Sequence, residues 1–220
     1  MIRRLFFPGL LNTGPVCDRL LAVRDGFVNL YVLHGPDGIV CIDAGWRPAG
    51  VTLGFETLGL DTRDVSAIFL THGHWDHARC LRLYPNAEVF VGEHEDVSSL
   101  ARWRNPTQSL VALRDGQIVT AAGLTVRAIR TPGHTPGSVS YLVGERLLFV
   151  GDTLRLRGGE IFPFYAIFNS DGEAIVRSIH RLGRINAIEC LLTAHSGITS
   201  DLAGAFRRWR GPMHQERDHS

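Results

Sequence analysis

The chain has 220 residues, of which 45% are hydrophobic and 20% are charged, a composition that excludes a largely disordered chain, a collagen-like repeat and a coiled coil. The formal net charge is +1, so no overall field would attract nucleic acid or an anionic membrane. All 23 basic residues are Arg, which excludes a Schiff-base lysine enzyme and a P-loop protein. Histidine is the unusual part of the composition, with ten residues.

The cysteines and the apolar runs indicate the compartment and the domain count. The cysteines form no C-x-x-C pair, so neither a disulfide framework nor a Cys-based zinc ribbon is expected. The chain starts with MIRRLFFPGLL, which is too short and too broken by Pro8 and Gly9 for a typical signal peptide. No stretch reaches the ~20 apolar residues of a membrane span. We therefore predict a cytoplasmic protein with one domain over residues 1–210 and a flexible tail over residues 211–220.

Strand and helix signals alternate along the first half of the chain. β-Rich runs at residues 27–33 and 39–42 flank a Gly-Pro-Asp-Gly turn and predict a hairpin that delivers Asp43 at a strand end. Apolar periodicity then predicts strands at residues 65–70 and 88–91, and helices at residues 49–58, 78–84 and 94–102.

The second half repeats this alternation. The same signals predict strands at residues 124–130, 139–143, 146–150 and 188–193, and helices at residues 172–182 and 201–210. Ser170 or Asp171 is expected to cap the first of these helices. The mixture of strands and helices indicates an α/β layered domain.

Polar side chains that can bind a metal ion follow four of the predicted strands. They are His72, His74, Asp76 and His77, then His134, then Asp152, and finally His195. A single His after a strand is more often a hydrogen-bonded structural residue, but four such side chains within the H-x-H-x-D-H run would be costly to desolvate with nothing bound. Imidazole and carboxylate together suit zinc, iron or manganese.

The motifs and their order resemble those of the metallo-β-lactamase superfamily, from about Asn29 to about His195. The run HGHWDH is similar to the first metal motif of the family, TPGHTPGS to the second, GDT to the third and TAHSG to the fourth. Asp43 resembles an early Asp of the family that supports the metal loop from behind the ligands.

This resemblance implies a four-layer αββα sandwich and two divalent metal ions, with Zn²⁺ preferred over Fe or Mn. His72, His74 and His134 would hold one ion, the other would be held by Asp76, His77 and His195, and Asp152 would bridge them. Two ions that share a water molecule lower its pKa toward neutrality, and the resulting hydroxide attacks a carbonyl carbon. Asp76 is the expected catalytic residue, which would orient this nucleophile or move its proton.

The resemblance favours a metal-dependent hydrolase that cleaves a thioester, ester or lactone. Asp152 indicates the branch of hydroxyacylglutathione hydrolases, lactonases and persulfide dioxygenases, because metallo-β-lactamases usually have Cys or Ser there. The segment GDTLRLRGG also resembles that branch, but no Cys-Gly-Arg signature follows it, and Ala78 and Arg79 stand where the family often has smaller residues. These two departures argue against a glutathione thioester as the substrate.

Three other functions stay open on the sequence. A mononuclear iron persulfide dioxygenase would use only His72, His134 and Asp152, a triad of two His and one carboxylate. A β-lactamase is a further alternative, and so is a non-catalytic protein in which the metal only stabilises the fold. The expected partner is a small-molecule substrate, with no nucleic acid or membrane, and both a monomer and a homodimer are compatible with the sequence.

Substrate contacts are expected from the segment that follows Asp152. Phe162, Phe164 and Tyr165 could form a substrate wall, and the alternative is ordinary core packing. Arg155 and Arg157 could bind a substrate carboxylate, and the alternative is a solvated face. The histidines outside the motifs have no assigned role; they are His34, His94, His180, His214 and His219.

Overall fold

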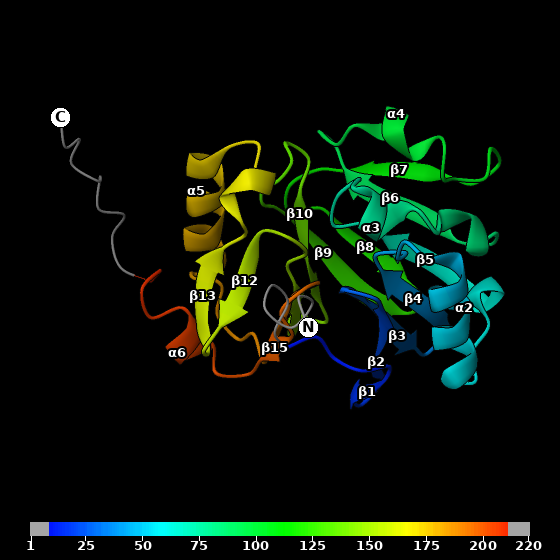
Figure 1. Ribbon diagram of the computed structural model, residues 1–220, viewed down its shortest axis with the longest axis horizontal. Helices are drawn as coiled ribbons and strands as arrows, with labels where there is room; N and C mark the ends of the chain where they lie inside the picture. The colour runs from blue at the N-terminus through cyan, green and yellow to red at the C-terminus, as the bar shows by residue number, and fades with distance from the viewer. Residues whose placement is uncertain (1–8, 211–220) are drawn as a thin grey trace.

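The computed structural model describes residues 9–210 and contains two large β-sheets that face each other (Figure 1). The first sheet has seven strands in sequence order, antiparallel from β1 to β4 and parallel from β4 to β7. Its strands are β1 (Gly14–Cys17), β2 (Leu20–Asp25), β3 (Val28–Gly35), β4 (Gly38–Ile42), β5 (Val65–Phe69), β6 (Glu88–Gly92) and β7 (Leu110–Leu113). The predicted hairpin before Asp43 is therefore confirmed as β3 and β4.

The second sheet has six strands in the order β15-β14-β11-β10-β9-β8. They are β8 (Ile118–Ala121), β9 (Leu124–Arg130), β10 (Val139–Val143), β11 (Leu147–Phe149), β14 (Cys190–Leu192) and β15 (Ile198–Thr199). A separate hairpin of β12 (Leu154–Arg157) and β13 (Glu160–Pro163) lies where neither a strand nor a helix was predicted.

The main core lies between the two sheets, where buried apolar residues of both inner faces form one cluster. Two buried tyrosines from opposite sheets also join the sheets by hydrogen bonds. The hydroxyl of Tyr31 on β3 donates to the carbonyl of Thr193 at 2.7 Å, and that of Tyr141 on β10 donates to the carbonyl of Leu70 at 2.8 Å. Both carbonyls belong to residues just beyond a strand end, so these bonds fix the start of two polar loops.

Helices cover the outer faces of both sheets (Figure 1). Helix α2 (Pro48–Thr57) buries Val51 and Phe55 in a second apolar cluster on the outer face of the first sheet. Helices α5 (Gly172–Leu182) and α6 (Leu202–Ala205) bury apolar side chains in a third cluster on the outer face of the second sheet. The expected α/β fold with four αββα layers is thus confirmed.

Some predicted helices are wrong or too long. The helix predicted over residues 78–84 is replaced by the short helix α3 (Trp75–Ala78) and the 3-10 turn η2 (Leu81–Leu83), since Leu81 and Tyr84 reach the core from a tight turn. The helix predicted over residues 94–102 shrinks to α4 (Val97–Leu100), and that over residues 201–210 shrinks to α6. Two further turns, η1 (Thr62–Asp64) and η3 (Ala166–Phe168), complete the described elements.

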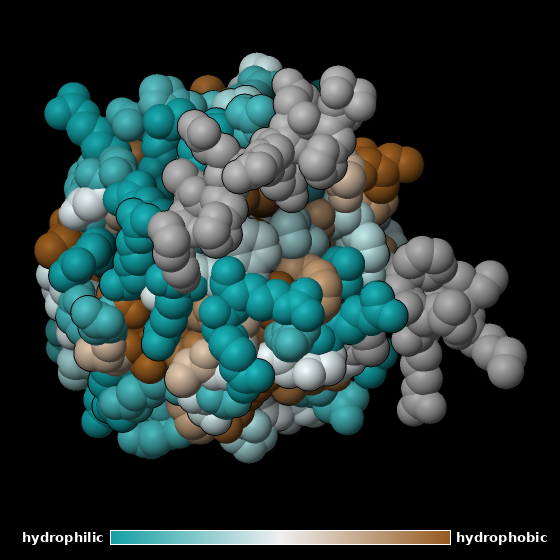
Figure 2. All heavy atoms as spheres, turned by 90° about the vertical axis from the view of Figure 1, so that its left-hand side faces the viewer, coloured by the Kyte–Doolittle hydropathy of each residue, from teal (hydrophilic) through white to brown (hydrophobic). Residues whose placement is uncertain are grey.

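The face formed by α5 and α6 is mainly hydrophilic where Figure 2 shows it. On the solvent side of α5, Arg177 pairs with Glu173 at 3.2 Å. Over residues 9–210, no helix has the length and the apolar character that crossing a membrane requires. The expected tail at residues 211–220, with His214 and His219, lies outside the described residues.

Candidate metal centre

Four loops that follow β5, β9, β11 and β14 bring the predicted ligands to one place. The first of these strands belongs to one sheet and the other three to the second sheet, so the site lies at the edge where the sheets meet. All seven predicted ligands take part in groups that could hold a metal ion. These groups are His72, His74 and His134; His72, His77 and Asp152; and Asp76, His77 and His195.

The first group of three histidines is compact. The Nδ1 atom of His74 lies 3.1 Å from Nε2 of His72 and 2.9 Å from Nε2 of His134. The rings of His72 and His134 are buried, whereas His74 is exposed. These three nitrogens therefore converge on a single point that remains open to solvent on the His74 side.

A second group, formed by Asp76, His77 and His195, contains one of the two carboxylates. Nε2 of His195 lies 3.4 Å from Oδ2 of Asp76, and Nε2 of His77 lies 3.7 Å from the same oxygen. Asp152 lies between the groups, with Oδ2 at 3.5 Å from Nε2 of His134 and Oδ1 at 3.3 Å from Nε2 of His195. The Asp152 carboxylate thus presents one oxygen to each group.

Four of the five rings are oriented by a contact on the side away from the centre. Nδ1 of His77 lies 2.8 Å from Oδ2 of Asp43, and Nδ1 of His195 lies 2.8 Å from the carbonyl oxygen of Phe27. For His72 and His134 the outer partners are the hydroxyl of Thr71 and the amide oxygen of Asn169. Such contacts fix the tautomer and leave Nε2 as the inward atom.

Asp43 also holds the backbone of the metal loop. Its Oδ1 atom accepts a 2.8 Å hydrogen bond from the backbone N–H of Thr71, and the Thr71 hydroxyl lies 3.0 Å from both carboxylate oxygens. The backbone of Asp43 has φ of 63°, a left-handed conformation that is costly for most residues and that Asp tolerates better. The expected supporting position of Asp43 therefore agrees with its contacts.

These donors fit a metal ion. Nε2 of His77 and Oδ1 of Asp152 are buried and, in the described part of the chain, make no hydrogen bond of normal geometry; they approach each other only to 3.5 Å. Tetrahedral zinc with bonds of about 2.0–2.1 Å separates its ligand atoms by roughly 3.3–3.4 Å, close to the N–O separations found here. Three neutral imidazoles and nearby carboxylates are also the donor types that zinc prefers.

The histidine pKa values shift in opposite directions in the two groups: they are lowered in the group of His72, His74 and His134 and raised in the group of His77 and His195. Burial lowers the pKa values of His72, His74 and His134. Burial also disfavours the charged forms of His77 and His195, but nearby carboxylates, chiefly Asp43 for the former and Asp152 for the latter, outweigh it. The pKa of His77 therefore lies well above its ordinary value, and that of His195 rises to about 9.

Glu95 is a supporting residue that the sequence did not reveal. Its Oε2 atom accepts a 2.6 Å hydrogen bond from the hydroxyl of Thr135, and its carboxylate also accepts from the backbone N–H of Gly73. Gly73 lies between two predicted ligands, and Thr135 follows His134. Glu95 thus ties the two metal loops together, and only tertiary structure could have revealed it.

The predicted substrate residues lie on two sides of the β12–β13 hairpin. Phe164 is buried, and its ring centroid lies 5.2 Å from that of His134 and 5.5 Å from that of His195. The Arg155 guanidinium stacks on Phe162 at 5.2 Å and on Tyr165 at 4.6 Å from the ring centroids. Arg157 is exposed at the end of β12. Of these residues, Phe164 makes contact with the candidate ligands, and a substrate role for all five stays a prediction.

The comparison with protein families agrees with the fold and the site. Residues 23–199 match the model of the metallo-beta-lactamase superfamily, and this segment includes all seven candidate ligands. The chain therefore belongs to the metallo-β-lactamase superfamily.

Curated relatives include a probable polyketide biosynthesis zinc-dependent hydrolase, BaeB, from Bacillus velezensis, which is 33% identical over 151 residues. That match covers 67% of this chain and 61% of BaeB. A hydroxyacylglutathione hydrolase from Synechococcus sp. is 32% identical over 193 residues, which cover 86% of this chain and 70% of that protein. The chain thus spans about three fifths of the length of BaeB.

Solved structures show the same fold. A metallo-beta-lactamase family protein from Thermus thermophilus has a TM-score of 0.69 and 24% identity, and the match covers 88% of this chain and 79% of that chain. A B3 metallo-beta-lactamase, described as the first with an active-site glutamic acid, has a TM-score of 0.69 and 18% identity, covering 94% and 89%. At such identities the likeness concerns the fold alone.

Proposed function

We propose that this chain is a metal-dependent hydrolase that cleaves a thioester, ester or lactone with a water molecule held between two divalent ions, preferably zinc. The observation that carries this proposal is the convergence of seven His and Asp side chains whose inner atoms face two adjoining points. The printed names of the relatives, a zinc-dependent hydrolase and a hydroxyacylglutathione hydrolase, support the same class of reaction.

Each side chain has a distinct role in this proposal. His72, His74 and His134 would hold one ion, Asp76, His77 and His195 would hold the other, and Asp152 would contact both. When bound, the ions supply an activated water of lowered pKa and a Lewis acid for the carbonyl oxygen.

Asp76 is the proposed proton acceptor. Burial disfavours its ionised form, but His77 and the hydrogen bond with His195 outweigh burial and lower the pKa of its carboxyl group. Its side chain is 13% exposed, so it lies between the buried ligands and the solvent. An ionised carboxylate at this boundary can orient the nucleophile and pass its proton to the leaving group.

The complete second group favours two ions over the mononuclear iron alternative. A persulfide dioxygenase needs only His72, His134 and Asp152, whereas here Asp76, His77 and His195 also converge within one site. Four contacts on the outer side of the rings orient histidines of both groups. A site kept for one ion would not require the support of the second group.

The test combines metal analysis with a substrate screen on the same purified sample. We expect two first-row metal ions per chain and hydrolysis of at least one acyl thioester, ester or lactone, lost on chelation and restored by zinc. Full activity in a metal-free preparation would contradict the proposal. Oxygen uptake by the iron-loaded protein with a persulfide, without any hydrolysis, would favour the dioxygenase, and turnover of β-lactams alone would favour a β-lactamase.

A further inference from the structure

A groove with a volume of about 540 Å³ opens directly beside the first group of candidate ligands. His74 and His134 form its inner end, and residues around α4 and η3 form its two sides. This volume lies within the range of about 300–1,000 Å³ that is usual for small-molecule sites. A substrate whose carbonyl lies at the candidate metal centre can therefore place one of its arms in this groove.

Large apolar side chains form part of the groove wall, next to polar residues such as Ser99 and Asn169. Seven large hydrophobic residues are exposed among residues 9–210, and three of them line the groove: Trp75, Ile167 and Phe168, which are 44%, 86% and 55% exposed. Trp103 completes the wall and packs against the core of the first sheet. Clustered exposed apolar side chains next to a reactive centre indicate a binding surface.

The charge of the groove selects against anions. Among the described residues that line it, Glu95 and Asp96 are acidic and none is Arg. Arg102 stacks on Trp103 at 5.7 Å from the ring centroid but does not line the groove. Arg155, which was expected to bind a carboxylate, stacks on Phe162 and Tyr165 and does not line it either. A carboxylate on the substrate arm would thus meet the like charges of Glu95 and Asp96 without an Arg to pair with.

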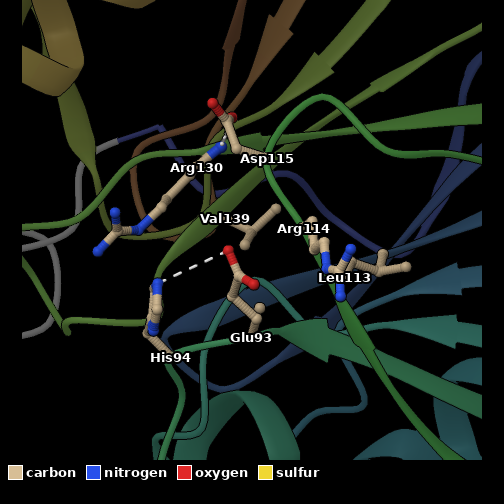
Figure 3. Close-up of a pocket in the computed structure, with 9 residues that line it drawn as sticks. Glu93, His94, Leu113, Arg114, Asp115, Arg130 and Val139 are labelled. Carbon is tan, nitrogen blue, oxygen red and sulfur yellow. Dashed lines mark hydrogen bonds and ion pairs between the residues drawn. The ribbon is translucent and has the colours of Figure 1, made fainter.

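A nearby crevice offers no alternative for this arm. It lies where the ends of β6 and β7 meet β9 and β10, and the side chains of Glu93, His94 and Arg130 surround it (Figure 3). It leaves no space for even a water molecule. There, Nε2 of His94 lies 3.6 Å from Oε1 of Glu93. The groove beside His74 is therefore the better place for a ligand.

We infer that this groove binds an uncharged, apolar arm of the substrate, which makes neutral acyl compounds better substrates than glutathione thioesters. This inference rests on the proposed hydrolase function and narrows its substrate class. Glutathione carries two carboxylates, and the described residues that line the groove include no Arg to receive either of them, whereas Glu95 and Asp96 are acidic. A linear or branched hydrocarbon chain instead gains contact with Ile167, Phe168 and Trp103.

The first test uses two series of zinc-loaded assays, one lengthening the acyl arm of a thioester from acetyl to hexanoyl and one lengthening the thiol arm. We expect one of the two series to show a rise in kcat/KM of at least tenfold, since the methylenes that lengthen the arm from acetyl to hexanoyl each add to binding when they are buried in the groove. A matched hexanoyl-sized arm that ends in a carboxylate should lose at least about tenfold, and so should the glutathione thioester. The inference would be overturned if kcat/KM did not change with arm length in either series, or if the arm that ends in a carboxylate were preferred.

Variants then locate the effect in the groove. The double variant Ile167→Ala/Phe168→Ala removes two mainly exposed side chains, and we expect the hexanoyl-to-acetyl ratio of kcat/KM to fall at least fivefold. Leu53→Ala on α2, where the side chain is 63% exposed, is the matched control and should keep the ratio. Ser99→Arg should raise kcat/KM for the carboxylate-ended arm at least fivefold. An unchanged ratio in the double variant would overturn the inference.

A binding measurement separates this inference from the proposed function. Isothermal titration of the zinc-loaded protein with hexanamide and with its carboxylate-ended analogue should show tighter binding of hexanamide, weakened by Ile167→Ala/Phe168→Ala. If hexanamide binds in this way but no ester, thioester or lactone is cleaved, the hydrolase function fails while the groove stands. If cleavage occurs without preference for the neutral arm, the function stands and the inference fails.

Discussion

The carboxylate of Glu95 lies 2.6 Å from the hydroxyl of Thr135 and so joins the loop of His134 to the loop that contains Gly73. Removing this carboxylate in Glu95→Ala should weaken zinc binding about 10–100-fold, the usual effect of losing a group that orients metal ligands. Competition with a chromophoric chelator measures the affinity. Glu95→Gln keeps an acceptor for Thr135 and should lose less, and Glu93→Ala, at a neighbouring position outside these contacts, should bind zinc normally. Unchanged affinity in Glu95→Ala would show that the loops do not need this connection.

Asp43 should matter in a similar way for the second group. Asp43→Ala removes the partner of His77 Nδ1 and of the Thr71 backbone N–H, so the second zinc ion should bind about 10–100-fold more weakly. Asp43→Asn tolerates the left-handed backbone and keeps an acceptor for Thr71. We expect its affinity for the second ion to lie between those of Asp43→Ala and the native protein. Stepwise metal titration checks the order of the three proteins. Equal affinity of all three for the second ion would contradict the supporting role of Asp43.

Metal binding should depend on pH differently for the two groups. Because the pKa values of His72, His74 and His134 are lowered, the first ion should displace few protons near pH 7. The pKa values of His77 and His195 are raised, so the second ion must displace two protons, and its affinity should rise with pH up to about 9. Calorimetry in buffers of different ionisation enthalpy counts these protons. Equal proton release in both steps would contradict the assignment.

The raised pKa of His195 also predicts how the stability of the metal-free protein changes with pH. His195 has its pKa raised from 6.5 to about 9 in the folded chain, so its contribution is fully present below pH 6.5 and disappears as the pH rises through 9. The loss amounts to roughly 1 kcal/mol per pH unit. Thermal unfolding of chelated protein between pH 6.5 and 9.5 should therefore show a falling Tm. His195→Gln should flatten this dependence, and a parallel slope in that variant would contradict the assignment to His195.

Asp152 should be needed for both ions, because its two oxygens face the two groups. Asp152→Asn is nearly isosteric, yet it removes the charge that offsets the buried metal ions. We expect fewer than two metal ions per chain and a decrease in kcat/KM greater than the 10–100-fold typical of supporting residues. Elemental analysis and kinetics on the same sample test this. Asp171→Asn, at the exposed cap of α5, is a matched control that should keep both ions.

Much of the fold could be predicted because its signals are local. Strand β10 is a run of five buried residues, and α5 is capped by Asp171, whose carboxylate accepts from the N–H groups of Glu173 and Ala174. Sequence patterns left β1, β2, β7, β8, β15 and the β12–β13 hairpin undetected. Most of these strands are too short for a periodic pattern to stand out.

The candidate ligands could be predicted for a different reason. His72, His74, Asp76 and His77 lie within six residues, and that density is visible without a structure. The groove could not be found in this way, because residues as distant in the chain as Trp103 and Phe168 come to line it only after folding. Glu95 was missed for the same reason, since its partners are 22 and 40 residues away. Local motifs therefore indicated the chemistry, and tertiary contacts indicated the specificity.

Because the candidate ligands come from both sheets, the candidate centre is complete only after both sheets have folded and packed together. The loop after β5 comes from the first sheet, whereas His134, Asp152 and His195 come from the second, and β14 is among the last strands of the chain. A chain that has emerged only as far as β11 holds the first group but lacks His195. In the proposed two-ion site, full affinity for the second ion would therefore arise only when both halves have docked, and uptake of that ion would report the final assembly step.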